Sequence, residues 1–265
     1  RYNARKQTAH GVSFMFEELF SLKGKTALIT GGSGAIGQGA AQVFLELGAK
    51  IILAGRTEEH LSAAKAALPQ DGEVLTVLGD ACDPVHVEEL VEVATSSGGV
   101  DILVNSVGTN RRKPILEATP EDLELLWQVN MASVWAVTQA LAPQMVEKGY
   151  GKIINMCSIG SFVGLEFKTM YAITKGALAQ HTRSAAVELA PYGIRVNALA
   201  PGYVDTPMTH AWIHSEREAE YLAKIPLGKY AEVSDLQGTF ALLASPASDH
   251  ITGQIIVIDG GETIW

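Results

Sequence analysis

A tyrosine and a lysine stand four residues apart in the stretch YAITK, Tyr171–Lys175, inside a segment with a helical pattern. Residues i and i+4 of a helix lie on one face, one turn apart. The pKa of a free tyrosine is about 10, and a neighbouring ammonium lowers the pKa of the phenol because it stabilises the phenolate. The pair could therefore move a proton near neutral pH, or it could serve only packing and solvation.

A glycine-rich stretch, TGGSGAIG, directly follows the first β-like run of the chain. Glycines at such a place let the backbone turn tightly and approach a pyrophosphate, which binds at the N-terminus of the next helix. Plain turns also use glycine, but the position between a first strand and a first helix favours a dinucleotide site. The residues expected to contact the cofactor here are Gly31, Ser33, Gly34, Ala35, Ile36 and Gly37.

The next two strand ends bear on the choice of nucleotide. Gly55 stands where NAD sites usually carry an acidic residue, and Arg56 follows it. A guanidinium suits a 2′-phosphate, so we expect NADP, with NAD and a merely solvated arginine as the alternatives. After the third strand, Asp80 and the adjacent Ala81 are expected near the adenine, although Asp80 could equally cap the next helix.

The scaffold that must position these groups follows from the alternation of patterns along the chain. Helical segments separate seven β-like runs, which are Lys25–Thr30, Lys50–Ala54, Val74–Leu78, Asp101–Asn105, Lys152–Met156, Arg195–Leu199 and Gln254–Ile258. The runs are continuously apolar, as in parallel strands that helices cover on both faces. We predict an α/β fold: one doubly wound Rossmann-type domain with a seven-stranded parallel sheet, residues 22–265, after an N-terminal extension, residues 1–21.

The helical segments expected between these strands complete the pattern. They are Gly37–Leu47, Glu58–Leu68, Val85–Ser96, Pro120–Lys148, Met170–Tyr192 and Val233–Ser245. In the N-terminal extension, Phe14, Met15, Phe16, Leu19 and Phe20 could form a short apolar helix face.

Composition narrows the classes of function. The 265 residues are 47% hydrophobic and carry a formal net charge of −9, which argues against nucleic acid or an anionic membrane as the partner. No apolar stretch reaches the roughly 20 residues of a membrane-spanning helix. The two cysteines, Cys82 and Cys157, lack metal-ligand spacing, so we expect a reduced, cytoplasmic protein without a bound metal.

Together these motifs resemble the short-chain dehydrogenase/reductase family, from about Leu22 to Gly261. The resemblance is carried by Thr30–Gly37, Asp80, Asn105–Gly108, Asn130, Ser158, Tyr171–Lys175, Arg195–Gly202 and Ile251–Gly261. Two positions depart from the family pattern. Ala35 replaces a glycine, and Val107 replaces an alanine where the backbone passes the cofactor.

The resemblance implies roles for four residues. Tyr171 is the general acid/base, and Lys175 lowers its pKa and reaches the ribose of the cofactor. Ser158 orients the substrate oxygen, with Ser161 as the less well spaced candidate, and Asn130 holds a water that links Lys175 to solvent. Further cofactor contacts implied are Asn105, Gly108, Pro201, Gly202, Val204 and Thr206, with Met208–Lys224 as a mobile lid whose Trp212 could line the pocket.

The substrate is suggested by a basic cluster after the fourth strand, Arg111, Arg112 and Lys113. Arg111 and Arg112 could bind a substrate carboxylate, or the cluster could be a solvated loop end. The stretch is similar to the gluconate 5-dehydrogenase branch of the family, which interconverts a sugar acid and its keto form. The alternatives are a 3-oxoacyl-carrier-protein reductase, for which the cluster would dock an acidic carrier, another ketone reductase, or a non-catalytic dinucleotide-binding regulator.

The resemblance also implies an assembly. Family members are commonly homotetramers, so a homotetramer or homodimer is expected, with the helices from near Pro120 and Met170 pairing across subunits.

Overall fold

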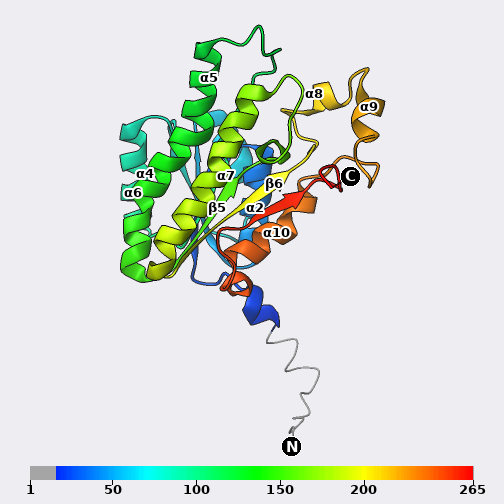
Figure 1. The fold of residues 1–265 in the computed structure, drawn as a ribbon. Coiled ribbons are helices and arrows are strands. Elements are labelled where there is room, and N and C mark those ends of the chain that lie inside the picture. Colours follow the sequence, from blue (N-terminus) through cyan, green and yellow to red (C-terminus); the bar gives the residue numbers. More distant parts are fainter. Residues whose placement is uncertain (1–15, 265) are drawn as a thin grey trace, which may run out of the picture.

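The structure is a computed structural model that describes residues 16–264. Its centre is one parallel sheet with the strand order β3-β2-β1-β4-β5-β6-β7 (Figure 1). The strands are β1 Thr26–Thr30, β2 Lys50–Gly55, β3 Val74–Leu78, β4 Ile102–Asn105, β5 Gly151–Met156, β6 Ile194–Pro201 and β7 Ile255–Ile258. This confirms the predicted seven-stranded, doubly wound α/β sheet. The strand order reverses between β1 and β4, and ligands bind at such a switch point.

Helices cover both faces of the sheet. On one face lie α2 Ala35–Glu46, α3 Glu58–Ala67 and α10 Ser234–Ala244; on the other lie α4 Pro84–Ser96, α6 Ser133–Lys148 and α7 Thr169–Leu189. Successive residues of β1 serve the two layers, because Ala27 and Ile29 pack under α2 while Leu28 packs toward α4 and α6. The strands therefore read as unbroken apolar runs.

The long helix expected over Pro120–Lys148 is not continuous. It consists of α5 Pro120–Trp127, a π-helical turn η1 Gln128–Ala132, and α6. The turn centres on Asn130, which is fully buried and uses its amide to bind a neighbouring loop. The helix expected to end at Tyr192 instead ends at Leu189 and continues as a 3₁₀ turn, η3 Ala190–Tyr192, because Pro191 cannot donate an α-helical hydrogen bond.

The segment expected to act as a lid carries two short helices, α8 His210–Ile213 and α9 Glu218–Leu222. An aromatic group ties it to the loop after β6: the Tyr203 ring lies 5.2 Å from Trp212 and 5.4 Å from Tyr221, centroid to centroid. The lid therefore rests on the carboxyl edge of the sheet.

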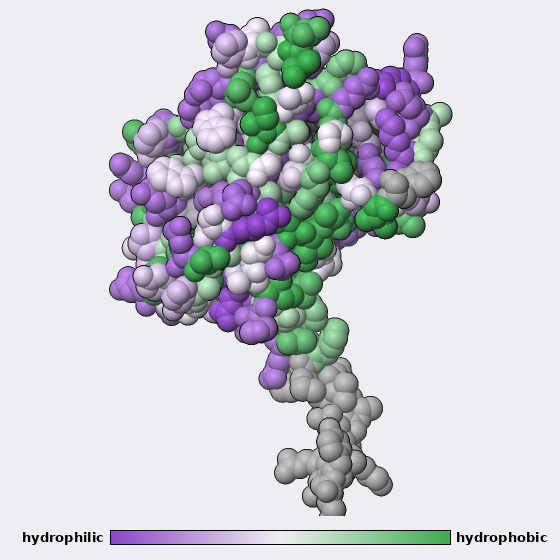
Figure 2. Space-filling view, viewed as in Figure 1, coloured by the Kyte–Doolittle hydropathy of each residue, from purple (hydrophilic) through white to green (hydrophobic). Residues whose placement is uncertain are grey.

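The surface carries one apolar feature that the ribbon view does not reveal. Figure 2 shows a hydrophobic band over β7 and α10 that continues toward the short helix of residues 16–20. Val257 on β7 is 38% exposed and Phe16 is 64% exposed. The predicted apolar helix face also includes Phe14 and Met15, which lie outside the described residues. Among the described helices, none is both long and apolar enough to cross a membrane.

Candidate active site

Three of the four residues expected to be catalytic meet at the start of α7 and the end of β5. The Lys175 ammonium lies 5.7 Å from the centre of the Tyr171 ring and donates a hydrogen bond of 2.6 Å to the Met156 carbonyl. Ser158 follows β5, and its hydroxyl accepts from the Gly160 amide at 3.2 Å. Tyr171 and Lys175 are held in register by the helix, and Ser158 is held by the turn after the strand.

Burial sets the proton affinities of this group. It raises the pKa of the Tyr171 phenol, and a hydrogen bond with Ser158 counters that rise. It also lowers the pKa of Lys175 to about 8, against a smaller opposite effect of Cys157. A lysine with a pKa of about 8 exchanges a proton far more readily near neutral pH than an exposed lysine does.

Ser161, the alternative to Ser158, already uses its hydroxyl in a hydrogen bond within the fold. The Ser161 hydroxyl donates to the Lys175 carbonyl at 2.8 Å, so its proton is used inside the scaffold. The Ser158 side chain instead forms a hydrogen bond with Tyr171 that lowers the pKa of the phenol, so its hydroxyl faces the tyrosine. Geometry therefore favours Ser158 as the residue that orients a substrate oxygen.

Asn130 joins the same group through the loop after β4. Its side-chain oxygen accepts from the Thr109 amide at 2.8 Å, and its amide nitrogen donates to the Thr109 carbonyl at 3.0 Å and to Thr174 at 3.1 Å. A Cβ on Gly108 would lie 3.6 Å from the Asn130 oxygen and 3.7 Å from the Lys175 ammonium. The structure thus brings Gly108, Asn130 and Lys175 together, and π-helical turns are frequent at functional sites.

The glycine-rich loop has the close packing that a phosphate-binding turn needs. Gly31 has a φ of 65°, and a Cβ there would lie 2.9 Å from the backbone of Ser106 and Val107. A Cβ on Gly37 would lie 2.5 Å from the Gly31 carbonyl oxygen. Helix α2 begins at Ala35 after the N-cap Gly34, which offers no side-chain cap. The first amides of α2 are therefore free for an anion, and this loop fits a pyrophosphate.

Arg56 directly follows β2 and Asp80 follows β3, and their side chains face each other. Their charged atoms lie 3.7 Å apart, and the Arg56 side chain is 71% exposed. A Cβ on Gly55 would lie 3.1 Å from the Ser33 hydroxyl, so Arg56 starts beside the glycine-rich loop. A cation in this place fits a 2′-phosphate.

The alternative role of Asp80 as a helix cap is wrong. Helix α4 is capped by Asp83, whose carboxylate accepts from the Val85 amide at 3.0 Å. Asp80 instead accepts from the Cys82 amide at 2.9 Å. Ala81 is buried in the core layer under α4.

The remaining residues expected to touch the cofactor lie at the same sheet edge. Asn105 ends β4 and donates to Asn155 at 2.9 Å and to Thr138 at 3.2 Å, so it also braces the strand ends. Pro201 ends β6, and Val204 and Thr206 belong to the loop after it. Gly202 packs against Asp259 so closely that a Cβ would lie 2.9 Å away.

The basic cluster divides into two parts. The Arg111 guanidinium lies 3.8 Å from Asp122 and is 52% exposed, and Lys113 also pairs with Asp122. Arg112 turns the other way: it donates to the Tyr221 hydroxyl at 3.1 Å and stacks 4.7 Å from the centre of the Trp212 ring. Its second terminal nitrogen, Nη1, is buried without a hydrogen-bond partner among the described residues. Arg112 is therefore the cluster member with an unused, buried donor.

Sequence reasoning missed two charged residues, Lys168, which interacts with Arg112, and Glu262, which interacts with Lys168. The Lys168 ammonium lies 4.6 Å from the centre of the Trp212 ring, and burial together with Arg112 lowers its pKa to about 8. Burial and Asp259 raise the pKa of Glu262 to about 7, although Lys168 opposes this. The position of Lys168, three residues before Tyr171, could have indicated that it lies near the site. Nothing in the sequence around Glu262, near the end of the chain, indicated the same.

The chain is similar to known proteins over most of its length. A family model described as enoyl-(acyl carrier protein) reductase matches residues 31–263. Gluconate 5-dehydrogenase of Gluconobacter oxydans is 35% identical over 93% of this chain and 98% of its own length. A 3-oxoacyl-[acyl-carrier-protein] reductase of Thermotoga maritima is 36% identical over 92% and 99%.

A solved structure extends the likeness to three dimensions. Gluconate 5-dehydrogenase of Burkholderia cenocepacia, in complex with NADP and tartrate, has a TM-score of 0.88 and 35% identity. The match covers 94% of this chain and 98% of that chain. The solved relative and this chain therefore share one architecture over most of their length.

Proposed function

The chain belongs to the short-chain dehydrogenase/reductase family of NAD(P)-dependent oxidoreductases that act on CH–OH groups, and from this premise we propose a sugar-acid substrate. The enzyme would interconvert a secondary alcohol and a ketone on a polyhydroxy acid, such as gluconate and 5-ketogluconate. The observation that carries this proposal is the buried Nη1 of Arg112, which has no hydrogen-bond partner among the described residues and so lacks the acceptor that a carboxylate would supply.

The loops that surround Arg112 support its place in the substrate site. The Thr109 backbone, three residues earlier, is bonded to Asn130. The Lys113 amide donates to the Phe167 carbonyl at 2.9 Å, which joins this loop to the segment just before Tyr171. A carboxylate held by Arg112 would therefore anchor the substrate on the side of the catalytic tyrosine.

We propose NADP as the preferred cofactor, held by the glycine-rich loop, the first turn of α2 and Arg56. The solved Burkholderia relative contains NADP, and Arg56 supplies the charge that a 2′-phosphate needs. When bound, the reduced cofactor supplies the hydride.

The residues of the chain handle the proton and the orientation. Ser158 donates its hydroxyl proton to the substrate oxygen and holds it against Tyr171, which protonates that oxygen during reduction. Lys175 lies one turn along the same helix face and stabilises the resulting phenolate. Asn130 holds the loop of Gly108 and Thr109 beside Lys175, so the path for a replacement proton stays in place.

The test is the rate of NADPH oxidation by purified protein with 5-keto-D-gluconate, with NADH run in parallel. A higher kcat/KM for the keto acid than for a 3-oxoacyl thioester or a neutral ketone supports the proposal. A preference for the thioester would replace the sugar acid with the carrier-protein reductase reading, for which the Thermotoga relative is the precedent. Tight NADPH binding without turnover of any carbonyl would favour the non-catalytic regulator.

We also propose that the protein is a cytoplasmic homotetramer. Large apolar side chains are exposed on the helices expected to pair, namely Trp127, Trp135, Ile173 and Val187. Both cysteines are free thiols, which suits a reducing compartment. Mass photometry of the purified protein tests the assembly, and a monomer at micromolar concentration would refute it.

A further inference from the structure

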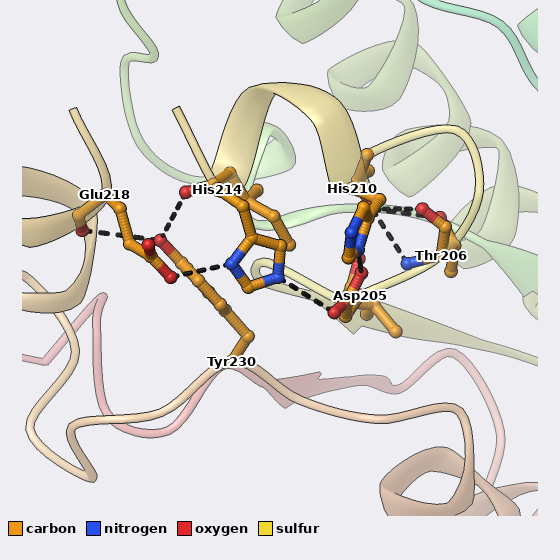
Figure 3. A network of polar contacts seen from close by, with 9 residues as sticks. Asp205, Thr206, His210, His214, Glu218 and Tyr230 are labelled. Atoms are coloured by element: carbon orange, nitrogen blue, oxygen red, sulfur yellow. Dashed lines mark hydrogen bonds and ion pairs between the residues drawn. The ribbon is translucent and has the colours of Figure 1, made fainter. Parts of the chain in front are cut away.

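Two histidines of the lid form a pair that the reaction above does not use. His210 and His214 stand four residues apart, at the start and just past the end of α8, so helical geometry places them on one face. Their ring centroids are 4.5 Å apart. The side chains turn toward Asp205, which lies in the loop after β6 (Figure 3).

The Asp205 carboxylate bridges the two rings. One oxygen lies 2.9 Å from His210 Nδ1 and the other lies 3.0 Å from His214 Nε2. One ligand atom from each of the three residues lies within 4.8 Å of the others. Tetrahedral zinc sites, with bonds of about 2.0–2.1 Å, separate their ligand atoms by roughly 3.3 Å. Side-chain adjustments of about 1.5 Å would therefore enclose an ion.

A second carboxylate, that of Glu218, contacts His214 on the ring nitrogen that faces away from Asp205. Glu218 on α9 lies 2.7 Å from His214 Nδ1 and leaves Nε2 directed at Asp205 (Figure 3). Metal-binding histidines almost always donate their other ring N–H to a carboxylate or carbonyl in this manner. The Tyr230 hydroxyl fixes the same corner, since it donates to the carbonyls of Ile213 at 3.0 Å and Glu218 at 3.4 Å.

We propose that Asp205, His210 and His214 bind a late first-row divalent cation of the zinc type, with Glu218 orienting His214. Two imidazoles and one carboxylate suit zinc better than magnesium or calcium, which prefer oxygen ligands. Three protein ligands leave one coordination position for water or a solute oxygen. A shallow surface hollow lined by Asp205, Thr206, Pro207, His210 and Ala211 gives that position access to solvent.

The site would join two parts of the molecule. Asp205 stands between Val204 and Thr206 in the loop that is expected to contact the cofactor, and the histidines belong to the lid. An ion bound to all three residues would fasten the first helix of the lid to this loop. Metal binding would therefore stabilise the lid, whatever substrate the enzyme takes.

The experiment is isothermal titration of ZnCl₂ into tag-free, chelator-treated protein of full length, with MgCl₂ as the comparison. We expect one equivalent of Zn²⁺ to bind and to raise the Tm, while Mg²⁺ does neither. His210→Asn and His214→Asn should abolish this binding, and Glu218→Gln should weaken it about 10- to 100-fold. The matched control is His60→Asn, an exposed histidine outside the cluster, which should bind Zn²⁺ like the wild type.

The same variants distinguish loss of the proposed site from a folding defect and from zinc binding elsewhere on the protein. Both cluster histidines are exposed, so their variants should share the Tm of the wild type in the presence of chelator. Absence of Zn²⁺ binding by the wild type would overturn the proposal. So would binding that survives in His210→Asn and His214→Asn, because the ion would then lie elsewhere, for example at His10 outside the described residues.

Discussion

Replacement of Arg112 by methionine removes the guanidinium and keeps most of the side-chain volume. In the folded protein one nitrogen of Arg112 donates to Tyr221 and the guanidinium stacks on Trp212, while Nη1 is buried without a hydrogen-bond partner among residues 16–264. A hydrogen bond from such a cation to a carboxylate contributes about 1.5–3 kcal/mol. At about 1.36 kcal/mol per factor of ten, the variant should lose about 10- to 150-fold in kcat/KM for an acidic substrate.

The loss should fall on KM, because the carboxylate is remote from the reacting carbon and is bound equally in the ground and transition states. The assay is steady-state NADPH oxidation with 5-keto-D-gluconate and, separately, with a neutral ketone. The neutral ketone has no carboxylate to lose, so its KM should change little. Arg112→Lys keeps the charge without the planar fork and should recover only part of the affinity.

The neighbouring arginine supplies the control. Arg111 is 52% exposed and lies 3.8 Å from Asp122, so Arg111→Met should leave both KM values unchanged within about twofold. Equal losses for acid and neutral ketone in Arg112→Met would refute the carboxylate assignment. An Arg111→Met variant as impaired as Arg112→Met would show instead that the cluster attracts the substrate through its combined positive charge, without a specific contact from Arg112. A Tm measured for each variant separates these outcomes from damage to the lid.

Three further variants test other parts of the site. Tyr171→Phe should bind NADPH normally by fluorescence titration and lose about 10²- to 10⁴-fold in kcat, and an active variant would remove Tyr171 as the acid/base. Arg56→Ala should raise the Kd for NADPH at least tenfold more than that for NADH, whereas equal changes would dismiss the 2′-phosphate contact. The raised pKa of Glu262, about 7, means that the folded protein keeps a proton that the unfolded chain releases near pH 4.3. Stability should therefore fall as pH rises from about 4 to 7, and Glu262→Gln, but not the exposed Glu117→Gln, should flatten that part of the Tm–pH curve.

The sequence was sufficient to predict those parts of the fold and of the candidate site that depend on local geometry. Helical periodicity puts Tyr171 and Lys175 on one face, and a parallel sheet collects the ends of β1, β4, β5 and β6 at one edge. The alternation of apolar runs and helical segments predicted the sheet, and the family resemblance supplied the roles of Ser158 and Asn130. Spacing already favoured Ser158 over Ser161, and the structure adds a reason that spacing does not contain: the Ser161 hydroxyl donates to the Lys175 carbonyl.

The sequence was insufficient to predict contacts between segments that lie far apart along the chain. The π-helical turn depends on hydrogen bonds between Asn130 and Thr109, which are 21 residues apart. Arg112 and Lys168 meet over Trp212, and Glu262 acts electrostatically on Lys168 from the end of the chain. These meetings depend on how the lid and the end of the chain fold back over the sheet. The spacing of His210 and His214 was visible, but Asp205 and Glu218 became their partners only through the turn that starts α8.

The π-helical turn also absorbs one residue of chain length. Its hydrogen bonds run from residue i to residue i+5, so each residue of Gln128–Ala132 turns the chain by less than the roughly 100° of a regular α-helix. One extra residue in an unbroken α-helix would rotate every later residue by about 100° about the axis, whereas the wider turn takes up most of that rotation. Val137, Leu141 and Met145 therefore stay against the sheet that buries them. Deletion of one residue within the turn should restore a regular α-helix and keep this core face, but it should cost the hydrogen bonds of Asn130 with Thr109. The extra residue thus lets one helix serve both the core and the candidate site.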